Sequence, residues 1–209
     1  MKIIAIEANI GAGKSTLLEP LRQEMQLWSG QDWNLILEPV DQDPEFHRLL
    51  KAFVAHPDDA DKRVEFQKYI TAQRQELLRG LPDGNYLIER SLFSDLVFTQ
   101  TYFLTAERPS AHYMDYYYDI KRRLKDYPKI DVVLYLDRDP KACYASIAKR
   151  GREGEHYPVE VLEDLKRFHD ACLPQICREY DTQLINVDLG KDYAIPSVIA
   201  CDAMEAIYG

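Results

Sequence analysis

Short runs of apolar residues alternate with longer segments of helical periodicity along the whole chain. The apolar runs lie at residues 3–7, 35–38, 86–89, 132–137 and 184–188. The helical segments, in which apolar side chains recur every three or four positions, lie at residues 14–27, 63–78, 92–104, 112–127, 140–149, 158–180 and 194–208. Apolar strands that alternate with amphipathic helices are typical of a parallel sheet covered on both faces. We therefore predict a single α/β domain over residues 1–209, with a doubly wound, five-stranded parallel sheet flanked by helices.

Each predicted strand ends in a carboxylate. The five acids are Glu7, Glu38, Glu89, Asp137 and Asp188. Ligands of open parallel sheets bind beyond the carboxyl ends of the strands, so we expect these acids to gather around one crevice. A single acid at a sheet edge is more often a helix cap or turn former than a catalyst, but five at one edge favour a functional site.

The first predicted strand runs into a stretch with the length and ending of a phosphate-binding loop. The stretch consists of Ala8, Asn9, Ile10, Gly11, Ala12, Gly13, Lys14 and Ser15, followed by Thr16. It fits the pattern G-x-x-x-x-G-K-[ST], except that Ala8 occupies the first glycine position, where alanine is tolerated if its φ stays negative. In such a loop the backbone N–H groups and the start of the next helix bind phosphate, the lysine reaches the β- and γ-phosphates, and the serine ligates Mg²⁺. The loop predicts binding of a nucleoside triphosphate and leaves the phosphate acceptor open.

Composition narrows the classes of partner. A net charge of -9 without a long basic block argues against nucleic-acid binding. No apolar run approaches the roughly 20 residues of a membrane span, and Met1 and Lys2 lead into an apolar strand rather than a cleavable leader, so we expect no membrane partner and a cytoplasmic protein. The 4 cysteines lack C-x-x-C spacing and are expected to be reduced packing residues, and the 5 histidines show no metal-ligand spacing.

Four further stretches, taken with the phosphate loop, resemble the deoxyribonucleoside kinase family. The stretches are Leu37-Glu38-Pro39-Val40, Phe66-Gln67-Lys68-Tyr69, Glu89-Arg90-Ser91 and Lys149-Arg150-Gly151-Arg152-Glu153-Gly154-Glu155. Their order and spacing are specific, and the resemblance covers nearly the whole chain. It implies a P-loop kinase fold with a short arginine-bearing lid at about residues 150–157. It also implies use of ATP and Mg²⁺, and direct transfer of the γ-phosphoryl group to the 5′-hydroxyl of a deoxynucleoside.

The resemblance assigns roles in the transfer step. Glu38 matches the general base that takes the proton of the 5′-hydroxyl, and Arg90 matches the arginine that orients this base and the 5′-oxygen. Glu89 matches the acid that helps Ser15 to hold Mg²⁺.

The lid is expected to stabilise the charge that develops during transfer. Arg150 and Arg152 match the lid arginines of the family, which would act on the transferring phosphoryl oxygens. The family commonly has another arginine one helical turn before Arg150, where this chain has Ser146.

The resemblance also predicts the acceptor pocket. Gln67 matches the glutamine that reads the edge of the base, because an amide both donates and accepts hydrogen bonds. Arg74 lies on the same helix face, and in the family an Arg/Asp pair at the positions of Arg74 and Asp95 goes with deoxycytidine or purine deoxynucleosides. Glu155 matches the acid that accepts a hydrogen bond from the 3′-hydroxyl, whereas Val54 stands where the usual sugar-contacting tyrosine is expected.

Two assignments lie outside the acceptor pocket. The segment 188–193 resembles the family's loop around the ATP adenine, so Asp188 and Asp192 are predicted to lie beside the donor. A helical stripe of aromatic and aliphatic residues is more often core than interface, but the family is commonly dimeric, and this stripe is a candidate contact for a homodimer. Its members are Tyr113, Tyr116, Tyr117, Ile120 and Leu124.

Two alternative functions remain at this point. A thymidylate-kinase-like enzyme would share the fold and phosphorylate a nucleoside monophosphate, but such an acceptor needs extra cations, and Glu38 before proline and valine favours an uncharged hydroxyl. A non-catalytic structural subunit with this fold would explain Ala8, Val54 and Ser146 as early losses. The joint presence of the loop lysine, the acid and the arginines argues against an idle site.

Overall fold

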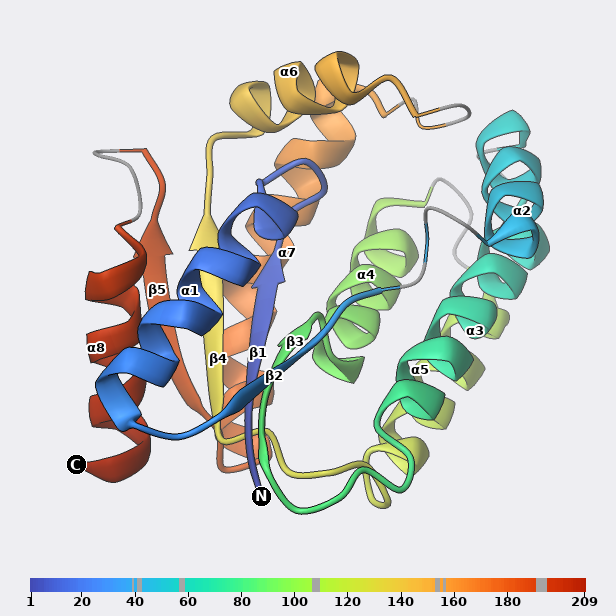
Figure 1. Ribbon diagram of the computed structural model, residues 1–209. Coiled ribbons are helices and arrows are strands. Elements are labelled where there is room, and N and C mark those ends of the chain that lie inside the picture. The colour runs from blue at the N-terminus through green and yellow to red at the C-terminus, as the bar shows by residue number, and fades with distance from the viewer. Residues whose placement is uncertain are drawn as a thin grey trace.

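The computed structural model describes residues 1–38, 40, 43–56, 59–106, 110–152, 155, 157–190 and 195–209. Within these residues five parallel strands form one sheet in the order β2-β3-β1-β4-β5 (Figure 1). The strands are β1 (Lys2–Ala8), β2 (Trp33–Ile36), β3 (Asn85–Glu89), β4 (Val132–Asp137) and β5 (Gln183–Asp188). Each strand overlaps a predicted apolar run, although β2 begins and ends two residues before the predicted run 35–38. The predicted five-stranded parallel sheet is confirmed.

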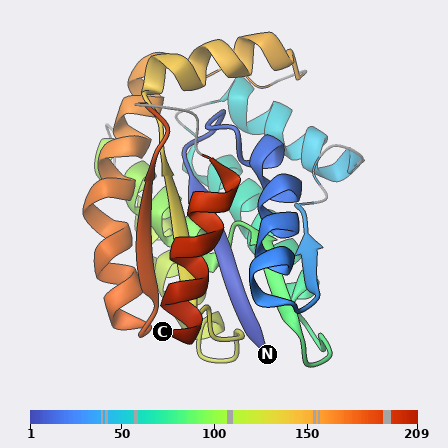
Figure 2. The same ribbon diagram turned by 60° about the vertical axis from the view of Figure 1, so that its left-hand side comes forward.

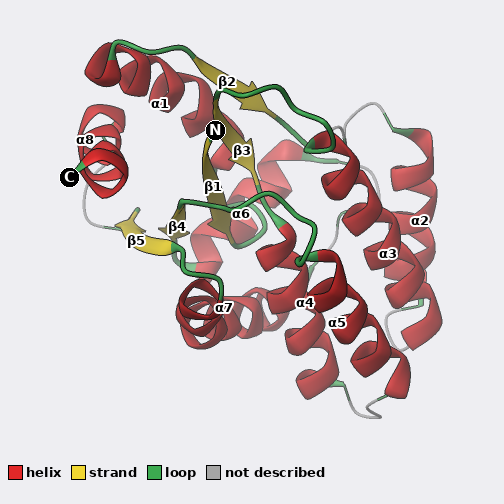
Figure 3. Ribbon diagram, turned by 90° about the horizontal axis from the view of Figure 1, so that it is seen from below, coloured by secondary structure: helices red, strands yellow, loops and turns green. Residues whose placement is uncertain are grey.

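Helices cover both faces of the sheet. Figure 3 shows α1 (Lys14–Ser29) and α8 (Pro196–Tyr208) on one face, and α4 (Leu92–Thr105) and α7 (Val159–Glu179) on the other. In the described part of the chain, no helix combines the length and the apolar character needed to cross a membrane.

The described residues form four more helices around the sheet and its two covering layers. Beyond α4 lie α2 (Pro44–Ala55), α3 (Ala60–Leu77) and α5 (Ala111–Arg123). The last, α6 (Pro140–Arg150), crosses above the carboxyl ends of the strands, as Figure 2 shows. The site edge of the sheet is therefore enclosed by α6 on one side and by the α2/α3 pair on the other.

The helix α2 is absent from the elements predicted from the sequence, so the prediction for residues 44–55 is wrong. Asp43 caps α2, because its carboxylate accepts hydrogen bonds from the backbone N–H groups of Glu45 and Phe46, and Pro44 occupies the first turn. The helix buries one apolar face that consists of Phe46, Leu49, Leu50 and Phe53. This spacing of three and four residues was a readable signal of an amphipathic helix.

The stripe on α5 packs inside the chain. Tyr113, Tyr116 and Ile120 are almost fully buried, and α5 packs against α3 and α4. The hydroxyl of Tyr116 donates to the backbone carbonyl of Gln67 at 2.9 Å. The stripe is therefore core, and its buried members are unavailable as a contact between subunits.

Candidate functional site

A cavity of about 500 Å³ lies at the carboxyl ends of the strands, within the usual size range of small-molecule sites. Among the described residues, its walls carry six cationic side chains and three carboxylates. The cations are Lys14, Arg74, Arg90, Arg138, Arg150 and Arg152, and the acids are Glu38, Glu89 and Glu155. A chain with a net charge of -9 thus concentrates positive charge in one concave place, as a site for anionic ligands does.

The phosphate loop joins the end of β1 to the start of α1. Ala8 is buried at the end of β1 and is not among the described residues with positive φ, so the condition for an alanine at this position is met. Gly11 and Gly13 have φ values of 76° and 97°, which favour glycine. A Cβ atom on Gly11 would lie 2.5 Å from the backbone oxygen of Cys143, so α6 packs directly on the loop.

The remaining loop residues complete the cradle. The side chain of Asn9 is buried, and its amide donates to the backbone carbonyl of Leu162 at 2.7 Å. Its amide oxygen accepts from the backbone N–H of Ile10 at 2.8 Å. No side chain caps the start of α1, so its first N–H groups are available to an anion.

Lys14, Ser15 and Glu89 meet at the mouth of the loop. Burial, aided by the nearby Arg90 charge, lowers the pKa of Lys14 to about 8. The Lys14 Nζ atom lies 3.9 Å from Glu89 Oε1, and the Ser15 hydroxyl donates to the same oxygen at 3.3 Å. A hydroxyl beside a carboxylate is a set of hard oxygen donors, which fits Mg²⁺.

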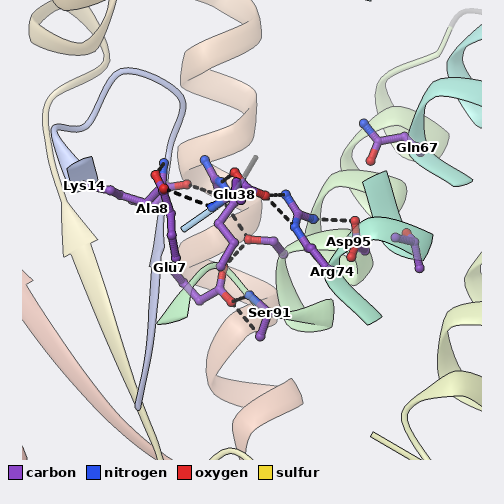
Figure 4. A network of polar contacts seen from close by, with 12 residues as sticks. Glu7, Ala8, Lys14, Glu38, Gln67, Arg74, Ser91 and Asp95 are labelled. Atoms are coloured by element: carbon purple, nitrogen blue, oxygen red, sulfur yellow. Dashed lines mark hydrogen bonds and ion pairs between the residues drawn. The ribbon is translucent and has the colours of Figure 1, made fainter. Parts of the chain in front are cut away.

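Arg74 bridges two carboxylates, as Figure 4 shows. Its Nε and Nη2 atoms lie 2.6 and 2.5 Å from Glu38 Oε1, and its Nη1 lies 2.5 Å from Asp95 Oδ1. Burial acts to raise the pKa of Glu38, but the charges of Arg74, Arg90 and Lys14 outweigh it and hold this pKa below its ordinary value. Glu38 is therefore ionised at neutral pH.

Asp95 is the deepest member of this group. Its side chain is fully buried, and burial raises its pKa to about 6, against the attraction of Arg74. The second carboxylate oxygen, Oδ2, is buried without a hydrogen-bond partner among the described residues. Arg74 lines the cavity and Asp95 does not, and Figure 4 shows Asp95 on the side of Arg74 opposite Glu38.

Arg90 is fixed from several directions. Its backbone has a φ of 64°, an uncommon value for a non-glycine residue, and its N–H donates to the carbonyl of Ile6 at 3.0 Å. Its Nη1 atom donates to the carbonyl of Ala8 at 2.7 Å and to Ser94 Oγ at 3.0 Å. The guanidinium lies 5.3 Å from the ring centre of Phe98, and Nε lies 3.8 Å from Glu38 Oε2. Strained backbone of this kind is common at functional sites.

The wall away from the phosphate loop is partly aromatic. Gln67 is buried in this wall, and its side-chain amide has no hydrogen-bond partner among the described residues. Its neighbours in the cavity wall include Phe46, Phe66, Phe98 and Tyr102. A free amide among aromatic rings can bind a flat, polar ring such as a nucleobase.

The lid arginines converge on one acid. Arg150, the last residue of α6, donates from Nη2 to Glu155 Oε2 at 2.6 Å, and Arg152 Nη1 lies 3.7 Å from Glu155 Oε1. Ser146 also lines the cavity, but its hydroxyl donates to the backbone carbonyl of Ala142.

The expectation that all five strand-end acids share one crevice is wrong for Glu7, Asp137 and Asp188, which do not line the cavity. Glu7 is fully buried and accepts from the backbone N–H and the hydroxyl of Ser91 and from the Ser94 hydroxyl, so it anchors the start of α4 (Figure 4). Asp137 pairs with Lys166 at 2.7 Å. The carboxyl ends of the strands lie at one edge of the sheet, but the apolar pattern of the sequence does not predict how deeply each acidic side chain is buried.

Only residues 188–190 of the predicted adenine loop belong to the described part of the chain. Asp188 lies outside the cavity wall, and its carboxylate accepts from the N–H of Gly190 at 2.7 Å. Asp192 lies outside the described residues.

Three polar residues of the described cavity wall have no role in the sequence prediction: Tyr102, Arg138 and Tyr157. Tyr102 lies four residues after Phe98 on α4, a spacing that places both on one helix face. Tyr157 closes the lid segment, and Arg138 directly follows β4. Position beside a strand end or a lid was the signal that could have found the last two.

Comparison with known proteins shows the family of this chain and supports its fold. The sequence matches the family model described as deoxynucleoside kinase over residues 4–203. Deoxycytidine kinase of Homo sapiens is 29% identical over 203 residues, which cover 83% of this chain and 75% of the human protein. Deoxyguanosine kinase of Dictyostelium discoideum is 28% identical over 193 residues, which cover 89% of this chain and 62% of that protein. The solved structure of deoxyadenosine kinase from M. mycoides with bound dATP matches with a TM-score of 0.72 at 24% identity, over 97% of this chain and 99% of that chain, and shares the fold.

Proposed function

Because this chain belongs to the deoxynucleoside kinase family, whose members are ATP-dependent phosphotransferases, we propose that it transfers the γ-phosphoryl group of ATP to the 5′-hydroxyl of a deoxynucleoside with an amino-bearing base. Phosphorylation of free deoxynucleosides is a reaction of nucleotide salvage. The proposal depends above all on Glu38, an ionised carboxylate held between Arg74 and Arg90 at the same cavity as the phosphate loop.

Glu38 is the general base of this proposal. Arg74 holds its Oε1 atom, while Oε2 faces Arg90 at 3.8 Å and is available to the 5′-hydroxyl. As the 5′-oxygen bonds to the γ-phosphorus and the bond from that phosphorus to the β–γ bridging oxygen breaks, the hydroxyl proton passes to Glu38 and ADP leaves. A weak base suffices because the transition state of phosphoryl transfer is loose, and little proton transfer precedes bond formation.

Four groups of the chain act on the phosphates. The loop N–H groups and Lys14 bind the donor, and Arg150 and Arg152 stabilise the charge on the transferring oxygens once a ligand competes with Glu155 for them. Ser15 and Glu89 would hold Mg²⁺. The ion supplies charge neutralisation at the β- and γ-phosphates when bound.

The acceptor lies on the aromatic side of the cavity. Gln67 reads the base edge with its free amide, and the Arg74–Asp95 pair selects for an amino-bearing base, since an unmatched carbonyl would leave buried polar groups without partners. Glu155 accepts from the 3′-hydroxyl. The three similar proteins reported above, which are kinases of deoxycytidine, deoxyguanosine and deoxyadenosine, support this class of acceptor.

The ion pairs of Glu38 with Arg74 and Arg90 disfavour a nucleoside monophosphate as the acceptor. An acceptor phosphate needs an unpaired cation near its binding site, yet Arg74 is shared by Glu38 and Asp95, and Arg90 also faces Glu38. A carboxylate at this point would repel an acceptor phosphate, whereas a neutral hydroxyl would meet no such repulsion.

We also propose a cytoplasmic homodimer. All 4 cysteines are free, as expected in a reducing compartment. The dimer follows from the family resemblance, and its contact must use a surface other than the buried stripe on α5. Light scattering coupled to size-exclusion chromatography tests the mass in solution.

The deciding experiment measures ADP release with deoxyadenosine, deoxyguanosine, deoxycytidine and thymidine monophosphate. We expect turnover with at least one amino-bearing deoxynucleoside and little with the monophosphate. Glu38→Gln should lower kcat by about 10²- to 10⁴-fold, the usual contribution of general base catalysis, with ATP affinity retained. Glu45→Gln, which changes an exposed acid of α2, is the control and should leave kcat unchanged.

Each failure has its own meaning. Dominant turnover of the monophosphate would establish the thymidylate-kinase-like alternative, and no turnover with any acceptor would establish a non-catalytic role. If Glu38→Gln keeps the natural rate, the carboxylate is not the base.

A further inference from the structure

Arg138 is a cation at the phosphate loop to which no motif assigns a role. It directly follows β4, and β4 pairs with β1, the strand that leads into the loop. Its Nη1 atom donates to the backbone carbonyl of Gly11 at 3.3 Å and lies 3.5 Å from the point where a Cβ atom on Gly13 would be. The side chain is half-buried and lines the same cavity as Lys14.

Arg138 differs from the other cations of the cavity wall in its pairing. Each of the other five has a carboxylate within 4 Å, and Arg138 has none among the residues that the structure describes. Its two acidic neighbours in sequence are engaged elsewhere: Asp137 pairs with Lys166, and Asp139 caps α6 through the N–H groups of Lys141 and Ala142. A guanidinium has five N–H donors, and the contact with Gly11 uses only one.

The order of the strands gives the side of the loop on which Arg138 acts. Glu38 follows β2 and Arg90 follows β3, whereas Arg138 follows β4, on the other side of β1. Lys14 points toward Glu89 and the Glu38 side. Lys14 and Arg138 therefore flank the loop, and Arg138 lies away from the acceptor.

We propose that Arg138 is a donor-binding residue whose guanidinium contacts the phosphate chain of ATP on the side opposite Lys14. An unpaired, half-buried guanidinium beside two glycines of the loop offers planar pairs of donors that match phosphate oxygens. It adds positive charge at the end of β4, and Ser146, a cavity-wall residue of α6, is neutral. The inference rests on the proposed function only in taking ATP as the donor.

The test measures ATP affinity by displacement of a fluorescent ADP analogue, without an acceptor. Arg138→Ala should weaken ATP binding by roughly 10- to 100-fold, as expected for loss of a hydrogen bond to a charged group. Arg138→Gln keeps an N–H donor for the Gly11 carbonyl but removes the charge, and should weaken binding nearly as much. Arg138→Lys keeps the charge and should restore part of the affinity.

A matched control separates this contact from the overall charge of the protein. Arg167→Ala removes an exposed arginine of α7 that pairs with Asp164, and should leave ATP affinity unchanged. Inorganic tripolyphosphate, used as a competitor, should lose affinity in Arg138→Ala by the same factor as ATP. The KM of the acceptor should not change in any of these variants.

Several results would overturn the proposal. If Arg138→Gln binds ATP as the natural protein does, the arginine only supports the loop through Gly11. If Arg138→Ala loses affinity for ATP and not for tripolyphosphate, the contact is to the nucleoside part. Equal effects of Arg138→Ala and Arg167→Ala would also refute it. Because the affinity measurements contain no acceptor, their outcomes are independent of whether Glu38 is the base.

Discussion

Lys14 is a buried amine in a cavity that also holds Arg90, and its protonation is therefore sensitive to ligands. Burial disfavours the charged form, so its pKa falls to about 8, while Glu89 and Glu38 oppose the shift. A bound triphosphate adds negative charge and favours the ammonium form. The free and the bound protein therefore differ in proton affinity at this residue.

This difference predicts a pH dependence of donor binding. Below about pH 8 Lys14 is charged and ready to bind; above it, binding must be accompanied by uptake of a proton, so ATP affinity should fall by up to about tenfold per pH unit. Isothermal titration at about pH 7, 8 and 9 measures this trend. Lys14→Arg stays charged over the whole range, so its ATP affinity should not change with pH. Constant affinity in the natural protein would show that Lys14 keeps its proton throughout.

Single residues were predictable where a contiguous motif carries them. Glu38, Gln67 and Arg90 each lie in a short stretch at a specific distance from the loop, and the structure brings all three to one cavity. Arg138 could not be found in this way, because its role depends on β4 lying next to β1. Its position after a predicted strand marks it as a residue of the sheet edge, but the strand order decides that it lies beside the phosphate loop.

At the scale of elements, the contact of α6 with the phosphate loop positions much of the site. Gly11 meets the backbone of α6 at Cys143, and the same helix ends at Arg150, at the start of the lid. The loop and the lid are thus joined through one rigid helix. A displacement of α6 would change donor binding and lid position together.

Substitution at Gly11 tests this contact. Gly11→Ala combines a strained φ of 76° with a Cβ atom 2.5 Å from a backbone oxygen, whereas Gly30→Ala, at φ 64°, meets nothing within 4 Å. We expect Gly30→Ala to lower the free energy of unfolding by about 1–2 kcal/mol, because alanine is strained at a positive φ. Gly11→Ala should cost a further 1–3 kcal/mol or so from overpacking, and should weaken ATP binding.

Urea unfolding of both variants, with and without ATP, measures these costs. Gly30→Ala is the control for backbone strain, and it should keep the ATP affinity of the natural protein. Equal losses of stability in the two variants, with ATP affinity intact in both, would mean that α6 does not pack against the loop.

Element prediction succeeded for the strands and failed for α2. Buried strands form continuous apolar runs, and these are visible without tertiary information. The signal of α2 is divided between the Asp43-Pro44 cap and four apolar positions, and the predicted helices do not include this segment. The helices on either side of this omission were placed correctly, with α3 beginning at Ala60, a few residues before its predicted start at residue 63.

On the scale of the whole molecule, charge is distributed unevenly. The chain carries a net charge of -9, yet the cavity wall described above holds more cations than acids. An anionic donor is therefore attracted locally by a protein that repels it from most other surfaces. A neutral deoxynucleoside experiences neither effect.

Ionic strength should separate the two substrates. Raising KCl from about 0.05 to about 0.5 M shortens the screening length severalfold, so the Kd of ATP should rise several-fold while the KM of the deoxynucleoside stays nearly constant. The neutral substrate is the internal control in the same preparation. Equal sensitivity of both constants would show that salt acts on the fold and not on the cavity charge.

The bridge formed by Arg74 limits how this enzyme can be redesigned. One guanidinium holds both the Asp95 carboxylate and the Glu38 carboxylate. Variants at position 74 that are selected to accept new nucleoside analogues should therefore also change in turnover number. Substitution at position 67 should not disturb Glu38, because the Gln67 amide has no hydrogen bond to Glu38. Directed evolution should therefore begin at 67 and keep 74 as wild type.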